Sequence, residues 1–153
     1  MNKPNKHLTK ITQIGIVVPD VDKIVEGMRQ IFGAEPDILG HTPPTEGRYY
    51  YGKPEPFSCK MAIYKFANID IELIQSESEK NIWNDFMDGG QHGLHHVRFS
   101  VDNFKETVQD LNERGASISM QGDSMTKGLK FAYFDTEKAL DFVVEIFNEY
   151  EPH

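Results

Sequence analysis

The feature that most constrains this chain is an internal repeat, because one order of strand and helix patterns occurs twice along the sequence. Residues 11–18 form a β-branched run that ends at Pro19-Asp20, and residues 94–101 form a similar run that ends at Asp102. An apolar pattern of helical spacing follows each run. Strand patterns then follow in both halves. Self-similarity of this kind is typical of a duplicated supersecondary unit. The sequence therefore predicts two tandem βαβββ modules.

The first module is expected to span residues 10–75, after a flexible N-terminal tail at residues 1–9. Within it, apolar residues at helical spacing predict a helix over residues 21–32 that ends at Gly33. Tyr49 to Tyr51 is predicted to form a strand, and residues 57–66 and 69–75 are predicted to form the arms of a hairpin.

A linker helix is predicted within residues 76–92, because apolar residues at helical spacing precede the pair Gly89-Gly90. The second module then occupies residues 93–153. Its helix is expected to be capped by Asp102 and to stop at Gly115, and its later strands are expected at residues 117–120, 129–134 and 141–147. Residues 135–138 are expected to form a turn.

The repeat also predicts how the modules come together. Two open four-stranded sheets can pair into one curved mixed sheet, with a ligand cleft between the repeats, which gives an α+β domain built around a metal cleft. The alternative is a single mixed α+β sheet in which the similarity of the halves is accidental. At 153 residues, either arrangement buries enough surface for one compact core.

Charge and composition exclude several functional classes. The net charge of −8 repels a phosphate backbone and no extended run of Lys or Arg offsets it, so nucleic acid is not an expected partner. The single cysteine, Cys59, precludes an internal disulfide framework. No apolar run approaches the ~20 residues that span a bilayer, and the first residues lack a signal-peptide core. We therefore expect a cytoplasmic protein with no membrane partner that binds a small molecule.

Polar residues fall at matching places on predicted strands of the two modules. Gln13 lies on the first strand of module one and His96 at the corresponding place in module two, whereas Glu72 and Glu145 each interrupt an apolar run on the last strand. Burying a carboxylate is costly unless it is paired or bound to metal. These four side chains form a mixed oxygen and nitrogen set suited to one divalent ion, Zn, Ni, Co or Mn, with coordination positions left open.

Each of these residues also has a simpler interpretation. Glu72 could face outward on an edge strand, Glu145 could pair with a lysine, and Gln13 could lie on the surface. A lone histidine is more often structural than ligating, and the neighbouring His95 could face either the solvent or the cleft. The joint placement of the four at symmetric positions favours the metal site.

Three segments give the chain a family resemblance: Trp83–Met87 (WNDFM), Gly93–Val97 (GLHHV) and Ile71–Gln75 (IELIQ). With the paired βαβββ plan, they make the sequence resemble the vicinal oxygen chelate superfamily, which includes glyoxalases, bleomycin resistance proteins and dioxygenases. It is most similar to methylmalonyl-CoA epimerase-like and lactoylglutathione lyase-like proteins. The resemblance implies metal ligation by Gln13, Glu72, His96 and Glu145, with Glu145 also the catalytic base, and a homodimer.

The chain also departs from the epimerase pattern. Epimerases usually have histidine in place of Gln13, and they use a second glutamate on the strand before Glu72, where this sequence has Lys60 or Met61. The ligand set of glutamine, glutamate, histidine and glutamate is instead similar to that of animal glyoxalase I.

These likenesses imply a metal-dependent isomerase or epimerase that stabilises an enolate by bidentate chelation and moves a proton next to a carbonyl. Its substrate would be an acyl-CoA or a thiol adduct. The alternatives are a lactoylglutathione lyase and a non-catalytic small-molecule-binding module. Basic residues at the cleft mouth would favour acyl-CoA, and the candidates are Lys60, Lys127, Lys130 and Arg98. Extradiol dioxygenase chemistry is least favoured, because it prefers two histidines and position 13 is glutamine.

Overall fold

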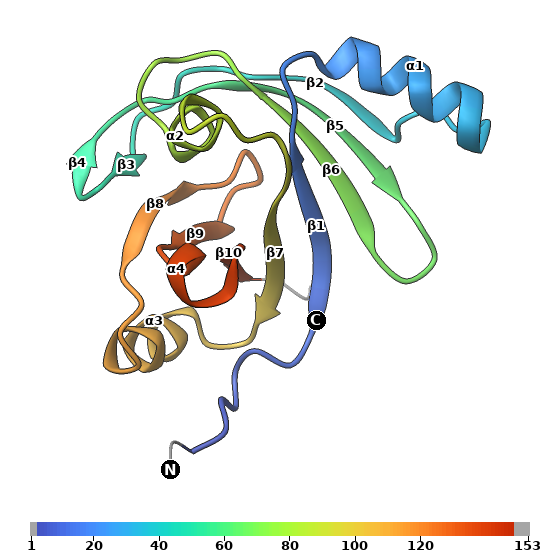
Figure 1. Ribbon diagram of the computed structural model, residues 1–153. Helices are drawn as coiled ribbons and strands as arrows, with labels where there is room; N and C mark the ends of the chain where they lie inside the picture. Colours follow the sequence, from blue (N-terminus) through green and yellow to red (C-terminus); the bar gives the residue numbers. More distant parts are fainter. Residues whose placement is uncertain (1–2, 149–153) are drawn as a thin grey trace.

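The computed structural model describes residues 3–148, which form one open mixed sheet of ten strands with four helices (Figure 1). In the first half the elements are β1 (Ile11–Val17), α1 (Val21–Phe32), β2 (Ile38–Thr42), β3 (Tyr49–Tyr50), β4 (Lys53–Pro54), β5 (Cys59–Lys65), β6 (Asp70–Ser76) and α2 (Ile82–Asp88). In the second half they are β7 (Gly93–Val101), α3 (Phe104–Glu113), β8 (Ile118–Asp123), β9 (Lys130–Phe134), α4 (Glu137–Leu140) and β10 (Val143–Asn148).

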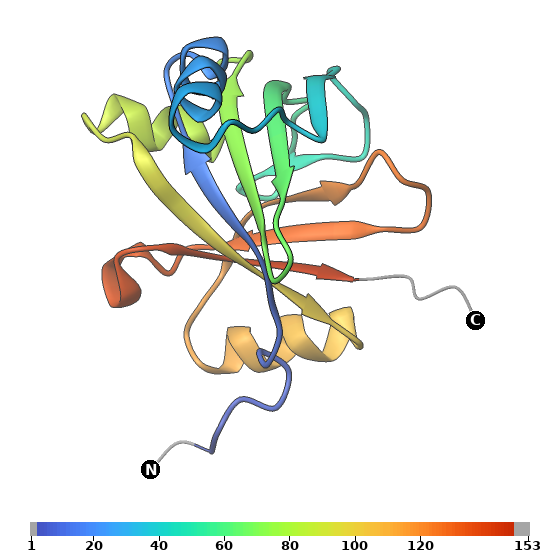
Figure 2. The ribbon, with the colours of Figure 1, turned by 90° about the vertical axis from the view of Figure 1, so that its right-hand side faces the viewer.

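The strand order confirms the predicted pairing of two similar modules. It runs β2-β5-β6-β1-β7-β10-β9-β8-β3-β4, so the first strand of each module lies at the centre and the two pair antiparallel. β6 pairs parallel with β1, and β10 pairs parallel with β7. In both modules, therefore, the last strand lies beside the first. Figures 1 and 2 place α1 and α3 at opposite ends of the molecule, as a pseudo-two-fold requires.

One hairpin breaks the symmetry. β3 and β4 belong to the first half of the chain, yet β3 pairs with β8 of the second module, with Tyr49 opposite Gln121. Tyr51, predicted as strand, instead has a φ of 49° and lies in the turn between β3 and β4. The hairpin carries the chain across from one module to the far edge of the other.

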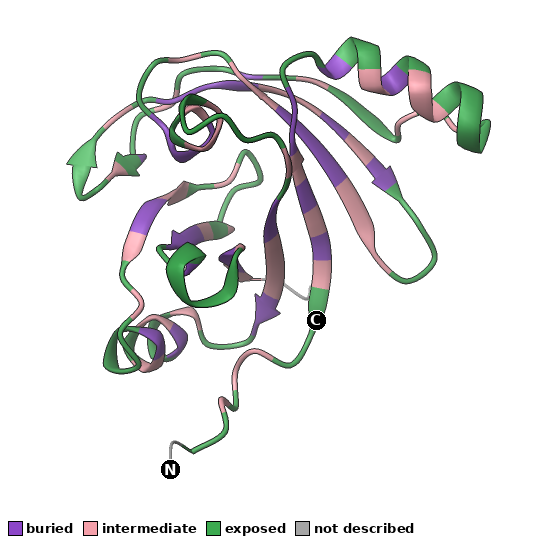
Figure 3. Cartoon of the chain, viewed as in Figure 1, coloured by how far each residue is buried: buried purple, intermediate pink, exposed green. Residues whose placement is uncertain are grey.

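Local sequence explains the elements that position the site. Side chains alternate along β1, so Gln13, Gly15 and Val17 are buried while the residues between them are less so (Figure 3). The side chain of Asp20 caps α1 by accepting from the Lys23 backbone N–H, and Gly33 ends the helix in the left-handed conformation. The predicted helix over residues 21–32 is confirmed at both ends.

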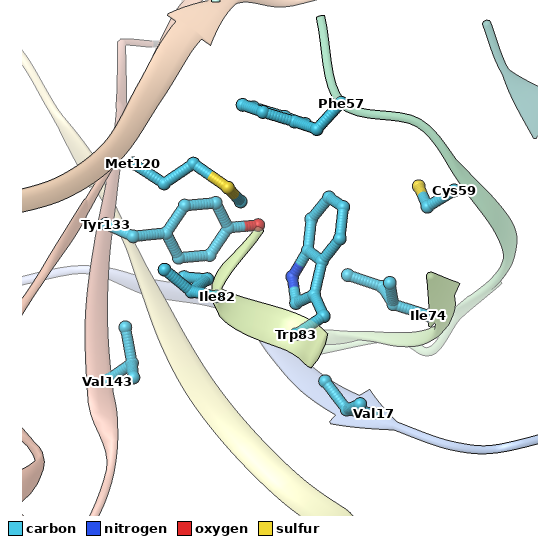
Figure 4. Close-up of a cluster of buried hydrophobic side chains, with 9 residues drawn as sticks. All are labelled: Val17, Phe57, Cys59, Ile74, Ile82, Trp83, Met120, Tyr133 and Val143. Carbon is cyan, nitrogen blue, oxygen red and sulfur yellow. The ribbon is translucent and has the colours of Figure 1, made fainter. Parts of the chain in front are cut away.

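The core of residues 3–148 consists of three clusters, and the central one joins the two modules. It combines side chains from both modules with Ile82 and Trp83 of α2 (Figure 4). The Trp83 ring meets Phe57 edge-on at 5.6 Å and Tyr133 at 6.3 Å between ring centroids. The other two clusters lie beneath α1 and α3. The linker helix therefore supplies the apolar contact that fixes one module against the other.

Three further expectations from sequence are corrected. Asn103, not Asp102, is the N-cap of α3, because its side chain accepts from the Glu106 backbone N–H at 3.0 Å. Residues 135–138 are not only a turn, since α4 begins at Glu137. The described part of the tail is not wholly loose, because Leu8 packs against the cluster beneath α3.

Among residues 3–148, no helix is long and apolar enough to cross a membrane.

The corrected cap gives a direct test. Replacing Asn103 by alanine removes the side-chain acceptor for the first turn of α3, so we expect Asn103→Ala to lower the free energy of unfolding by about 1 kcal/mol. Asp102→Ala, next to it in sequence, should cost less than half as much. Urea unfolding of both variants checks this, and an equal or larger loss in Asp102→Ala would show that the cap has been misassigned.

Candidate metal centre

Four adjacent strands carry the four residues expected to ligate a metal. Gln13 is on β1, Glu72 on β6, His96 on β7 and Glu145 on β10, which are neighbours in the order β6-β1-β7-β10. Gly15 is the register partner of both Glu72 and His96. All four side chains are buried, with exposed fractions of 2% for Gln13, 8% for Glu72, 0% for His96 and 5% for Glu145.

The distances show that the two modules bring their polar residues to one place. His96 Nε2 lies 3.3 Å from Glu145 Oε2 and 3.6 Å from Glu72 Oε1. Gln13, Glu72 and Glu145 line a single cavity. Glu72 does not face outward and Gln13 is not a surface residue. Among the described residues, the ion pair of Glu145 is with His96 and not with a lysine. The simpler interpretations of these three therefore do not describe the structure.

His96 is held by two neighbours that fix its ring. Gly15 lies directly opposite on β1, and a methyl group placed there would overlap Cε1, Nε2 and Nδ1 of the His96 ring. On the other side, His95 Nδ1 lies 2.9 Å from His96 Nδ1. This contact leaves His96 Nε2 as the ring nitrogen that faces the two glutamates.

His95 faces the interior, neither the solvent nor the cavity. It is 3% exposed, its ring meets Phe86 of α2 at 5.0 Å, and it is not among the residues that line the cavity. Burial, with a smaller contribution from His96, holds the pKa of His95 well below its usual value, so His95 is neutral. Its role in the structure is to orient His96.

The site contains two buried polar atoms that no described residue satisfies. His96 Nε2 and Glu145 Oε2 both lack a hydrogen-bond partner in residues 3–148, although they lie close to each other. Burial raises the pKa of Glu145 to about 7, while the nearby His96 and Arg98 act in the opposite direction. An unsatisfied buried polar atom costs roughly 1–3 kcal/mol, and an ion bound between the two atoms would remove that cost.

The arrangement is not a preformed three-ligand cage. Within residues 3–148, no three His, Cys, Asp or Glu side chains stand together at metal-holding positions. The donor chemistry nevertheless fits a divalent ion, since two carboxylates, an imidazole and the Gln13 amide are all buried on one face of the sheet.

The cavity above these residues has a volume of about 390 Å³, in the usual range for small-molecule sites. Its walls are mainly apolar, and both modules contribute to them. Two arginines, Arg48 and Arg98, also line it, whereas Lys60, Lys127 and Lys130 do not. Lys60 instead pairs with Asp22 at 2.7 Å. The apolar lining residues include Ile38, Phe57, Met61, Ile63, Ile74, Trp83, Phe131 and Phe147.

Two of the cavity residues that sequence reasoning missed bear on the chemistry of the site. Tyr133 stands beside His96, with ring centroids 5.1 Å apart, and it appeared in the sequence only as part of an apolar strand. Arg48 lies in a segment without periodicity, so no pattern marked it as buried. Of the four basic residues considered for the cleft mouth, Arg98 alone lines the cavity of the described chain.

Paired modules, a central cavity and a buried set of imidazole, amide and carboxylates define a small-molecule-binding α+β protein with donors suited to a metal. The sequence-family model of the Glyoxalase/Bleomycin resistance protein/Dioxygenase superfamily matches residues 12–133 of this chain. The chain therefore belongs to this superfamily, which is also called the vicinal oxygen chelate superfamily. Divalent metals are common among its members.

Solved structures show the same fold at low sequence identity. A hypothetical protein of Bacillus halodurans is 18% identical, with a TM-score of 0.72 over 97% of this chain and 99% of that one. A variant of Streptomyces coelicolor methylmalonyl-CoA epimerase in complex with 2-nitronate-propionyl-CoA is 18% identical, with a TM-score of 0.68 over 93% and 95%. Mycobacterium tuberculosis methylmalonyl-CoA epimerase is 14% identical, with a TM-score of 0.69 over 97% and 94%. No curated protein matches the chain at a significant level.

Proposed function

We propose that this chain is a divalent-metal-dependent isomerase or epimerase that moves a proton next to a substrate carbonyl. The observation that carries the proposal is the pair of unsatisfied buried atoms, His96 Nε2 and Glu145 Oε2, which face each other across 3.3 Å beside the cavity. An ion shared by these atoms, Glu72 and Gln13 would satisfy both. Zn, Ni, Co and Mn all accept such a donor set.

The proposed roles follow from where each side chain lies. The chemistry that a bound divalent ion supplies here is polarisation of the substrate carbonyl, which acidifies the adjacent C–H. Glu145 is the proposed base, because its carboxylate lines the cavity and burial makes it more basic than an exposed glutamate. Tyr133, the register partner of Glu145 on β9, lines the same cavity. The apolar walls keep water from the substrate carbon while it is deprotonated.

For the substrate, we propose first a 2-substituted acyl-CoA. Solved structures with this fold include an epimerase bound to an acyl-CoA analogue, and Arg98 at the cavity offers a cation for an anionic substrate. The protein is further proposed to be a cytoplasmic homodimer, as the family resemblance and the composition led us to expect.

A specific observation favours a second candidate, a lactoylglutathione lyase acting on a thiol adduct. Among the described residues that line the cavity, Glu72 and Glu145 are the carboxylates, and no third glutamate stands opposite them as a second base. Moving a proton between neighbouring carbons requires one base, whereas epimerisation by two opposed bases requires a second. Turnover of a methylglyoxal–glutathione hemithioacetal, compared with methylmalonyl-CoA, separates the two candidates.

The metal itself is the first part of the proposal to test. Elemental analysis of gently purified protein should find about one divalent ion per chain, and His96→Ala and Glu145→Ala should each lose it, because both remove a ligand. His41→Ala is the matched control, since His41 also borders the cavity but contacts Glu77 at 2.6 Å. A chain that neither carries nor takes up metal would contradict the proposal and favour the non-catalytic binding module.

A further inference from the structure

Arg48 is a buried cation that no carboxylate of the described residues neutralises. Its residue is 4% exposed, and none of the ion pairs within residues 3–148 includes it. Burial lowers the pKa of Arg48, the direction expected for a cation without a carboxylate partner. Burying an unpaired charge is costly, so a bound anion would stabilise an arginine that is buried without a carboxylate partner.

The hydrogen bonds of Arg48 leave part of its guanidinium unused. Nη1 donates to the Phe57 carbonyl at 2.7 Å and to the Pro43 carbonyl at 3.4 Å, and Nη2 meets the Met125 sulfur at 3.9 Å. Nε is buried and has no partner among the described residues. The group also lies over the Phe57 ring, 5.1 Å from its centroid. The contacts fix the plane of the guanidinium and leave N–H groups for a ligand.

The fold makes room for this side chain. Gly122 on β8 lies against its stem, and a methyl group at Gly122 would stand 2.7 Å from Arg48 Cγ. Arg48 also lines the same cavity as Gln13, Glu72 and Glu145, whose walls are otherwise mainly apolar. A ligand that fills the cavity can therefore meet carboxylates and a candidate metal at one place and an unneutralised cation at another.

We propose that Arg48 forms an anion-binding subsite of the cavity and receives a carboxylate or phosphate group of the substrate through its free guanidinium N–H groups. The inference deepens the proposed function by defining the substrate class: a small anion with an apolar body and a chelating pair of oxygens. Its assignment to the substrate of that enzyme rests on the proposed function, whereas the anion subsite itself does not require a metal.

The experiment compares hexanoate with its neutral analogue hexanamide on the full-length chain after chelator treatment, so that no metal can bind the carboxylate. Trp83 is the single tryptophan of the sequence and lines the cavity, so its fluorescence reports binding. We expect hexanoate to bind about tenfold more tightly than hexanamide, as for a charge-assisted hydrogen-bonded pair. A parallel titration with hexyl phosphate shows which anionic group the subsite prefers.

Variants assign the preference to a residue. Arg48→Met should abolish the preference for the anion, while Arg29→Gln, which alters an exposed arginine on α1 away from the cavity, should keep it. Arg48→Gln retains an N–H for the Phe57 carbonyl and replaces Arg48→Met if that variant does not fold. Equal binding of hexanoate, hexyl phosphate and hexanamide by the unaltered chain would overturn the proposal, as would a preference that survives in the Arg48 variant. Failure of the metal test would leave these outcomes unchanged, so the two proposals can fail separately.

Discussion

Glu145→Gln is expected to lower the rate of substrate C–H proton exchange about a hundredfold to ten-thousandfold, the usual contribution of a general base. The amide cannot accept the proton, although it nearly preserves the shape of the side chain on β10. Deuterium incorporation into methylmalonyl-CoA or the hemithioacetal, followed by NMR in D₂O, measures the effect for whichever substrate the unaltered enzyme exchanges.

Two controls separate loss of the base from loss of the ion. Glu77→Gln alters a glutamate that contacts His41 and does not line the cavity, so it should retain full exchange. Metal content is measured on the same Glu145→Gln preparation, and the rate is compared at saturating metal. Exchange at the normal rate in metal-loaded Glu145→Gln would exclude Glu145 as the base and leave another cavity residue to be found.

The repeat could be predicted from the sequence because its strands and helices follow local patterns: alternation along strands, capping residues before helices and glycines after them. Alternation along β1, the Asp20 cap and Gly33 predict the first strand and helix with their boundaries, and the same patterns recur from Gly93 onward. A polar residue at a buried strand position also stands out against its apolar neighbours. This contrast led to Glu72 and Glu145, which the structure places within reach of His96 Nε2.

The features that sequence did not predict depend on contacts between distant segments. Nothing local to Tyr49 indicates that β3 pairs with Gln121 of the other module. Arg48 is buried because Gly122, far along the chain, lacks a side chain where the arginine stem passes. Asp102 and Asn103 are both good capping residues, so composition alone could not decide between them. Periodicity indicates which face of an element is buried, but not what covers that face.

Gly15→Ala is the second change with a large expected effect, because Gly15 is where the backbone of β1 meets the His96 ring. The new methyl group would overlap three ring atoms, so either the ring turns away or the two central strands move apart. Overpacking of this kind costs about 1–3 kcal/mol in the free energy of unfolding. A displaced ring also takes Nε2 from the site, so we expect metal affinity to fall about 10- to 100-fold. Urea unfolding and a zinc titration measure the two effects.

A double variant shows whether the overlap with His96 is the cause. In His96→Ala the ring is absent, so adding Gly15→Ala should cost little further stability, and the two changes should be strongly non-additive. Gly40→Ala is the matched control, since Gly40 is also a strand glycine but a methyl group there would meet no atom within 4 Å. If Gly15→Ala bound zinc as tightly as the unaltered chain, the expected displacement of the His96 ring from the metal site would be wrong, and the strands would have moved instead. Loss of affinity in Gly15→Ala but not in Gly40→Ala would link the backbone at the junction of the two modules directly to the metal site.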